Sequence, residues 1–153
     1  MNQKNVRIVN LESMHIAAAI GFGKEPESIA WNKILTFVNA NDLTNKKNAR
    51  YFGFNNPNPS AGSPNYGYEQ WVTVPQGMAG TADVEIKDFA GGLYAVLRCQ
   101  GIDNIGHHWQ QLVSWAENSQ YQQGHHQWLE EVLTPPPTPE AEFVLDLYMP
   151  ITE

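Results

Sequence analysis

The segments Val6-Arg7-Ile8 and Val84-Glu85-Ile86 stand 78 residues apart and open a repeat that decides the fold. The same offset matches residue classes, without a gap, through a strand pattern, a glycine and then a helix pattern. Further matched pairs are Leu11 and Phe89, Ala17 and Ala95, Gly23 and Gly101, Trp31 and Trp109, Phe37 and Trp115, and Pro57 and Pro135. A chain of 153 residues built twice from one unit usually has a pseudo-twofold seam, which is a common place for a ligand cleft.

Each copy of the repeat predicts the order strand, helix, strand, strand. Apolar residues at helical spacing predict one helix per copy, with Trp31, Ile34, Leu35 and Val38 in the first and Trp109, Leu112, Val113 and Ala116 in the second. The predicted strands are Val6 to about Leu11, His15–Gly23, Tyr51–Asn55 and Tyr66–Val74, then Val84–Gly101 with a bend at Gly91-Gly92, Gln127–Leu133 and Glu142–Met149. Proline-rich segments at 56–65 and 135–139 predict loops.

We therefore expect an α+β fold, in which tandem β-α-β-β units form an antiparallel sheet with two helices and a ligand cleft between the units. The expected organisation is one domain over residues 1–153, with internal repeats at about 6–75 and 84–151. The length is sufficient for a substantial hydrophobic core, and the hydrophobic fraction of 42% argues against global disorder.

Composition excludes several classes of partner. The net charge of −7 argues against a nucleic-acid surface, which needs clustered basic side chains; the group Lys46, Lys47 and Arg50 is too small for one. Cys99 is the only cysteine, so no internal disulfide can form, and its apolar surroundings predict a core residue. No apolar run is long enough to span a membrane and no signal peptide opens the chain, so we expect a cytoplasmic protein.

Several motifs resemble one known family. The segment Tyr51-Phe52-Gly53-Phe54-Asn55-Asn56-Pro57 followed by Tyr66-Gly67-Tyr68-Glu69-Gln70-Trp71-Val72 resembles the GyrI-like domain, also called the AraC-type effector-binding domain. So do Phe89-Ala90-Gly91-Gly92-Leu93-Tyr94-Ala95-Val96 and Leu147-Tyr148-Met149-Pro150-Ile151, and the resemblance covers about residues 6–151. It implies a cleft between two units that often binds bulky apolar cations, and related domains sit in multidrug-responsive regulators.

The resemblance also implies one site residue and one limit on function. A glutamate in the first hairpin strand of the second unit usually faces the cleft, and Glu130 is the better match, although Val132 replaces the aromatic often found two positions later. No helix-turn-helix region accompanies the domain, so we expect a standalone member without direct nucleic-acid binding. Standalone members of the family include ligand binders, gyrase antagonists and hydrolases of reactive cytotoxins.

Strand parity gives a candidate site independently of the family, because alternate side chains face opposite sides of a sheet. Tyr68, Val72 and Val74 fit a helix-covered face, as do Leu145, Leu147 and Met149, and as do Leu129 and Leu133. The predicted ligand-binding residues lie on the other face and are Glu130, Glu69, Trp71, Trp128, Tyr148, Phe52, Phe54 and Asp146. Unpaired carboxylates among large aromatic rings are disfavoured in a core, but they suit a site for an apolar cation.

Plainer roles stay open for some of these residues. Glu69 also fits a solvated strand position, and Asp146 also fits an ion pair with Arg98 or a lysine. Glu131 is interpreted as the solvated neighbour of Glu130. The pairs His107-His108 and His125-His126 lack the spacing of helical zinc ligands, so we expect no metal, no cofactor and no assigned catalytic residue.

Three functions follow as hypotheses. The first is a binding protein for hydrophobic cationic small molecules. The second is a hydrolase of reactive electrophiles, with Glu130 as general base and Tyr148 positioning the substrate or donating a proton. The third is a protein-interaction inhibitor of an enzyme such as gyrase, with an unidentified protein partner.

Overall fold

The computed structural model describes residues 5–43, 49–56, 62–101, 105–134, 139 and 142–153. The chain forms two compact units, and each contains an antiparallel sheet with one helix, as the α+β prediction required. We call residues 14–89 the central unit, and residues 1–13 together with 90–153 the terminal unit.

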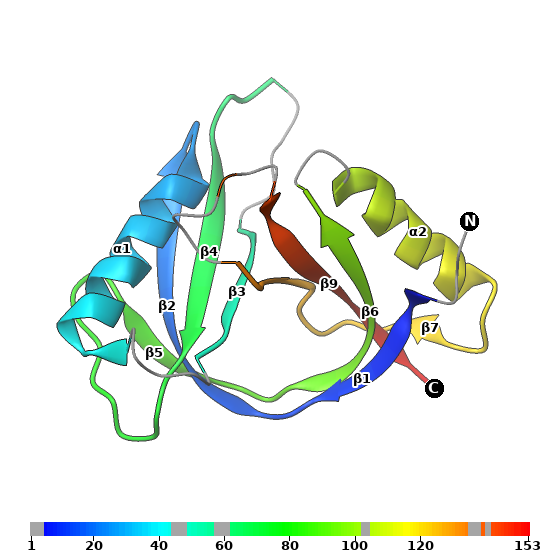
Figure 1. Ribbon diagram of the computed structural model, residues 1–153, viewed down its shortest axis with the longest axis horizontal. Helices are drawn as coiled ribbons and strands as arrows, with labels where there is room; N and C mark the ends of the chain where they lie inside the picture. The colour runs from blue at the N-terminus through cyan, green and yellow to red at the C-terminus, as the bar shows by residue number, and fades with distance from the viewer. Residues whose placement is uncertain (1–4, 44–48, 57–61, 102–104, 135–138, 140–141) are drawn as a thin grey trace. The chain divides into compact units, whose positions relative to one another are not determined.

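The central unit is a four-stranded antiparallel sheet covered on one face by a helix (Figure 1). Its elements in chain order are β2 (Met14–Gly23), α1 (Pro26–Ala40), β3 (Tyr51–Asn55), β4 (Tyr66–Thr73) and β5 (Glu85–Phe89). The strands pair in the order β3-β4-β2-β5. Strand β5 therefore pairs with β2 alone among the described strands of this unit.

The terminal unit repeats this plan. Its elements are β1 (Arg7–Leu11), β6 (Gly92–Gln100), α2 (Ile105–Glu117), β7 (Gln122–Gln123), β8 (Leu129–Val132) and β9 (Val144–Thr152). The strands pair in the order β1-β6-β9-β8, and β7 also pairs with β9. The chain bends before β6 at Gly91, as predicted from Gly91-Gly92. Gly91 has a φ of 78°, a conformation that L side chains rarely adopt.

The compact units differ from the sequence repeats in one respect: the first strand of each repeat pairs with a strand of the other repeat. Strand β1 belongs to the first repeat, but it pairs with β6, with Arg7 opposite Val96. Strand β5 belongs to the second repeat, but it pairs with β2, with Lys87 opposite Ile16. The sequence pattern alone contains no signal for this exchange.

Each unit has its own hydrophobic core between helix and sheet. In the central unit, Ile34, Phe37 and Val38 of α1 pack against Ala17, Ala19 and Val72. In the terminal unit, Leu112 and Ala116 of α2 pack against Ala95, Leu97, Cys99, Leu145, Leu147, Met149 and Ile151. Burying a large aliphatic or aromatic side chain of this kind contributes about 1.5–3 kcal/mol. The predicted apolar row of β9 and the core position of Cys99 are confirmed.

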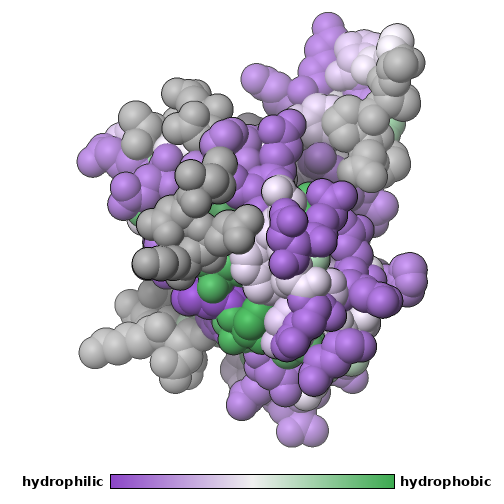
Figure 2. Space-filling model, turned by 90° about the vertical axis from the view of Figure 1, so that its right-hand side faces the viewer, coloured by the Kyte–Doolittle hydropathy of each residue, from purple (hydrophilic) through white to green (hydrophobic). Residues whose placement is uncertain are grey.

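The outer surface is polar where α2 lies. Figure 2 looks onto the side of the molecule that carries this helix and shows mainly hydrophilic residues with small apolar areas. Neither helix in the described part of the chain has the length and apolar character needed to cross a membrane. Most of the proline-rich segments at 56–65 and 135–139, and Lys46 and Lys47, lie outside the described residues.

Candidate functional site

The face of the central sheet turned away from α1 carries four of the predicted site residues. Phe52 is paired with Trp71, and Phe54 with Glu69, across β3 and β4. Directly paired residues share a face, whereas Val72, the neighbour of Trp71, belongs to the core under α1. The parity prediction for these strands is therefore confirmed.

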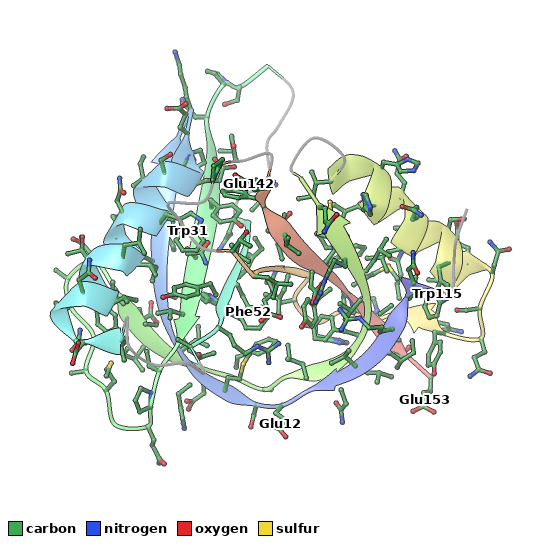
Figure 3. All side chains as sticks on the ribbon, viewed as in Figure 1. Glu12, Trp31, Phe52, Trp115, Glu142 and Glu153 are labelled. Carbon is green, nitrogen blue, oxygen red and sulfur yellow. The ribbon has the colours of Figure 1, made fainter. Side chains whose placement is uncertain are left out.

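Neighbouring residues of β3 serve the two sides of the sheet. Tyr51 stacks on Trp31 of α1 with ring centroids 5.4 Å apart, and Phe52 follows on the opposite face of the sheet. Figure 3 labels Trp31 of α1 and Phe52 of β3. Phe52 is fully buried, and the guanidinium carbon of Arg50 lies 5.0 Å from the centre of its ring. This distance is within the range of cation–π attraction.

Trp71 is the centre of an aromatic group on this face. Its ring lies 5.2 Å from Phe54 in an edge-on arrangement and 5.1 Å from Phe89 of β5. Sequence parity missed Phe89, because the prediction kept the strand of Phe89 within the second repeat. The three rings form an apolar wall beside a carboxylate, the side chain of Glu69.

Glu69 is buried, with 2% of its surface exposed, and it accepts three hydrogen bonds. Oε2 accepts from the indole nitrogen of Trp71 at 2.6 Å and from the ammonium of Lys87 at 2.9 Å, while Oε1 accepts from the amide of Asn56 at 3.1 Å. The alternative that Glu69 is a solvated strand residue is therefore wrong. A buried carboxylate of this kind is stable because a positive group and donors compensate its desolvation.

In the terminal unit, two of the sequence predictions are wrong. The register pairs Glu130 with Leu147, which belongs to the core under α2, and pairs Glu131 with Asp146. Glu130 therefore lies on the helix side, and Glu131, predicted to be solvated, is buried with 6% exposed.

Two further residues, Trp128 and Val132, also lie on the side of the sheet that α2 covers. Trp128 packs against the core under α2, with its ring 5.5 Å from Trp109, and Val132 packs against the same core.

A change of one residue in the repeat offset explains this error. The helices keep the offset of 78, since Ile34 corresponds to Leu112 and both are fully buried. The hairpin pairs Phe54–Glu69 and Glu131–Asp146 are related by an offset of 77. The second copy is thus one residue shorter between its helix and its hairpin, and a shift of one residue moves every strand side chain to the other face.

The corrected face of the terminal unit carries Glu131 and two tyrosines, Tyr148 and Tyr94. The hydroxyl of Tyr148 donates to Oε1 of Glu131 at 2.7 Å, and both side chains are buried. The ring of Tyr148 meets that of Tyr94 edge-on at 5.4 Å. Tyr94 donates its hydroxyl to the carbonyl of Gln127, and burial raises the pKa of this phenol. Tyr94 was missed, although its alternation with Ala95 in β6 was a usable signal.

Asp146 lies on the same face but is held by two arginines. Arg7 donates to Oδ2 at 2.9 Å, and Arg98 donates to Oδ1 at 3.0 Å. Burial opposes ionisation of this carboxyl, but the hydrogen bonds and charges of Arg98 and Arg7 lower its pKa below the ordinary value of 3.8. Asp146 therefore forms an ion pair with Arg98, as its open alternative stated, and with Arg7 of β1 in addition.

Two antiparallel units with one helix each agree with the fold of GyrI-like effector-binding domains, a class of small-molecule-binding domains. Within this class, the chain belongs to the family of integron-associated effector binding proteins, Cass2, whose family model matches residues 7–151. No sequence among curated proteins matches the chain.

Solved structures share the fold at low sequence identity. A hydrolase from Listeria innocua has a TM-score of 0.72 at 10% identity, over 99% of this chain and 94% of that one. The C-terminal domain of EcmrR has a TM-score of 0.72 at 11% identity, over 97% of each chain. SAV2435, solved with tetraphenylphosphonium bound, has a TM-score of 0.60 at 14% identity, over 96% of this chain and 93% of that one. At these identities the likeness shows the fold alone.

Proposed function

We propose that this chain binds hydrophobic organic cations on the sheet faces turned away from its helices. The observation that carries the proposal is the buried Glu131 carboxylate, which accepts the hydroxyl of Tyr148 while the ring of Tyr148 meets that of Tyr94. An aromatic wall attracts a cation by about 0.5–2 kcal/mol per ring, and a carboxylate among the rings adds charge complementarity.

Two further facts support a cationic ligand. The central unit repeats the combination, with Glu69 beside the rings of Trp71, Phe54 and Phe89. SAV2435, which shares the fold, was solved with tetraphenylphosphonium, a lipophilic cation. Apolar burial with a few such contacts supports micromolar binding, equivalent to about −8 kcal/mol.

The register of β8 and β9 supports Glu131, in place of Glu130, as the carboxylate that faces the ligand cation. Glu130 was the predicted residue, but it pairs with Leu147 on the side covered by α2. Glu131 takes its place, with Tyr148, Asp146, Phe52, Phe54, Glu69 and Trp71 retained from the predicted set. Trp128 is left out because it packs on Trp109.

Calorimetric titration of the chain with two ions of the same shape tests the proposal. Tetraphenylphosphonium and tetraphenylborate have similar size and apolar surface but opposite charge. We expect a micromolar Kd for the phosphonium and binding of the borate at least about tenfold weaker, or about 1.4 kcal/mol. Equal or tighter binding of the borate would show that charge complementarity with the carboxylates does not select the ligand.

The Glu131–Tyr148 hydrogen bond favours one second candidate, hydrolysis of a reactive electrophile. Glu131 would take a proton from water as the water oxygen bonds to the electrophilic carbon. Tyr148 would donate its proton to the leaving group and regain one from Glu131 through their hydrogen bond.

Incubation with an epoxide in ¹⁸O-labelled water tests this function by mass spectrometry. Labelled diol that Glu131→Gln abolishes supports it, and a rate equal to the uncatalysed one contradicts it.

A further inference from the structure

We infer that Lys87 is a specificity-determining residue, because its ammonium occupies the position at Glu69 that a ligand cation would take. A ligand must displace Lys87 to reach this carboxylate. The inference rests on the proposed function and assigns a selection step to the central unit.

The contacts of Glu69 define this position. Its Oε2 accepts both the indole nitrogen of Trp71 at 2.6 Å and the ammonium of Lys87 at 2.9 Å. The carboxylate is therefore neutralised by a positive group placed beside an aromatic cluster, the arrangement expected of a bound organic cation.

The two partners of the ion pair differ in freedom. Glu69 is fixed by Trp71, Asn56 and its own burial, with 2% of its side chain exposed. The side chain of Lys87 is 35% exposed and stands on β5, which pairs with β2 alone among the described strands. A lysine stem of four carbons rotates readily, and its ammonium is strongly hydrated in water. Lys87 can therefore leave, whereas the carboxylate stays in place.

Displacement favours ligands that bring apolar surface. The tethered ammonium has an effective concentration on the order of millimolar or more, so a small hydrated cation competes poorly with it. A cation with aromatic substituents also packs on Trp71, Phe54 and Phe89, and this burial offsets the lost ion pair. Lys87 would thus restrict the Glu69 position to hydrophobic cations.

Calorimetric titration of Lys87→Met with tetraphenylphosphonium and with tetramethylammonium tests the inference. We expect about tenfold tighter binding of the phosphonium than in the wild type, and measurable binding of tetramethylammonium that the wild type lacks. The double variant Glu69→Gln with Lys87→Met should lose both gains, because the carboxylate that Lys87 neutralises is then absent from the central unit.

Two controls isolate the local effect. Lys24→Met removes the same charge from an exposed position, and its phosphonium affinity should stay within about twofold of the wild type. Lys87→Gln removes the charge but retains a donor for Glu69. It replaces Lys87→Met as the test variant if Lys87→Met is unfolded at the titration temperature. Both Lys87 variants should tighten binding.

The outcomes separate this inference from the proposed function. If the wild type binds the phosphonium and neither Lys87 variant binds it more tightly, the inference is wrong and the proposed function stands. If only the Lys87 variants bind it, Lys87 excludes the ligand and the inference is supported. If neither the wild type nor a folded Lys87 variant binds the phosphonium or tetramethylammonium, both the inference and the cationic function are wrong.

Discussion

The hydroxyl of Tyr148 donates a 2.7 Å hydrogen bond to Oε1 of Glu131, and both residues are buried on paired strands, with Glu131 two residues beyond the direct partner of Tyr148. Leu129 is the direct partner of Tyr148, and Glu131 the direct partner of Asp146. This diagonal contact holds the carboxylate at the hydroxyl of Tyr148, whose ring meets that of Tyr94 edge-on. It is the feature on which the proposed cation site depends.

Replacing Tyr148 by Phe should destabilise the protein by about 1–3 kcal/mol, because a buried carboxylate loses a donor. Equilibrium unfolding in urea measures the change. Tyr121→Phe, at a half-buried tyrosine of the same unit, is the matched control and should change stability by less than about 0.5 kcal/mol. Equal stability of Tyr148→Phe and the wild type would mean that the hydrogen bond contributes nothing.

The ion pairs of Asp146 predict a pH-dependent loss of stability in acid. The folded pKa of Asp146 lies below the ordinary value of 3.8, so the unfolded chain takes up the proton first as the pH falls. The stabilisation is complete above pH 3.8 and is lost as the pH falls through the lower folded pKa. Relative to Asp146→Asn, we expect about 1–2 kcal/mol at neutral pH, discounted because both arginines are half exposed.

Urea unfolding of the wild type and Asp146→Asn from pH 7 to about pH 3 measures this difference. The two curves should converge in the acidic range. Asp83→Asn, at an exposed aspartate, should run parallel to the wild type throughout. A gap between the wild type and Asp146→Asn that stays constant to about pH 3 would contradict the assigned ion pairs.

Gly53 tests the close packing of the central hairpin. A methyl group on Gly53 would lie 2.6 Å from Cε2 of the buried Tyr68 ring, so Gly53→Ala should cost about 1–3 kcal/mol. Gly106→Ala in α2 is the control, because no atom of the described residues beyond its own helix backbone and chain neighbours lies within 4 Å of the new methyl group. Its helix propensity should raise stability by up to about 1 kcal/mol. Thermal melts compare the two, and equal effects would argue against the described packing of Tyr68.

The sequence predicted the fold class, both helices and the faces of β4 and β9, because the residue pattern over eight or nine positions identifies the face that the helix covers. It failed for β8, where four residues carry two adjacent glutamates and the pattern fits either face. The gapless offset of 78 then selected Glu130, although the hairpins are related by 77. One residue fewer between helix and hairpin was enough to reverse the assignment.

Sequence reasoning also failed to predict two of the charged partners of the site, Lys87 and Arg7. Lys87 reaches Glu69 because β5 pairs with β2, and Arg7 reaches Asp146 because β1 pairs with β6. Both pairings join strands from different repeats, more than 60 residues apart in the chain. Periodicity reports which face a residue occupies, but not which distant strand supplies its counter-ion.

The most direct test of the proposed site compares the two neighbouring glutamates of β8. Calorimetric titration with tetraphenylphosphonium should show that Glu131→Gln weakens binding about tenfold or more, or at least about 1.4 kcal/mol, because the carboxylate beside Tyr148 is lost. Glu130→Gln makes the same chemical change on the helix side and should stay within about twofold of the wild type. Weaker binding by Glu130→Gln together with unchanged binding by Glu131→Gln would contradict the account.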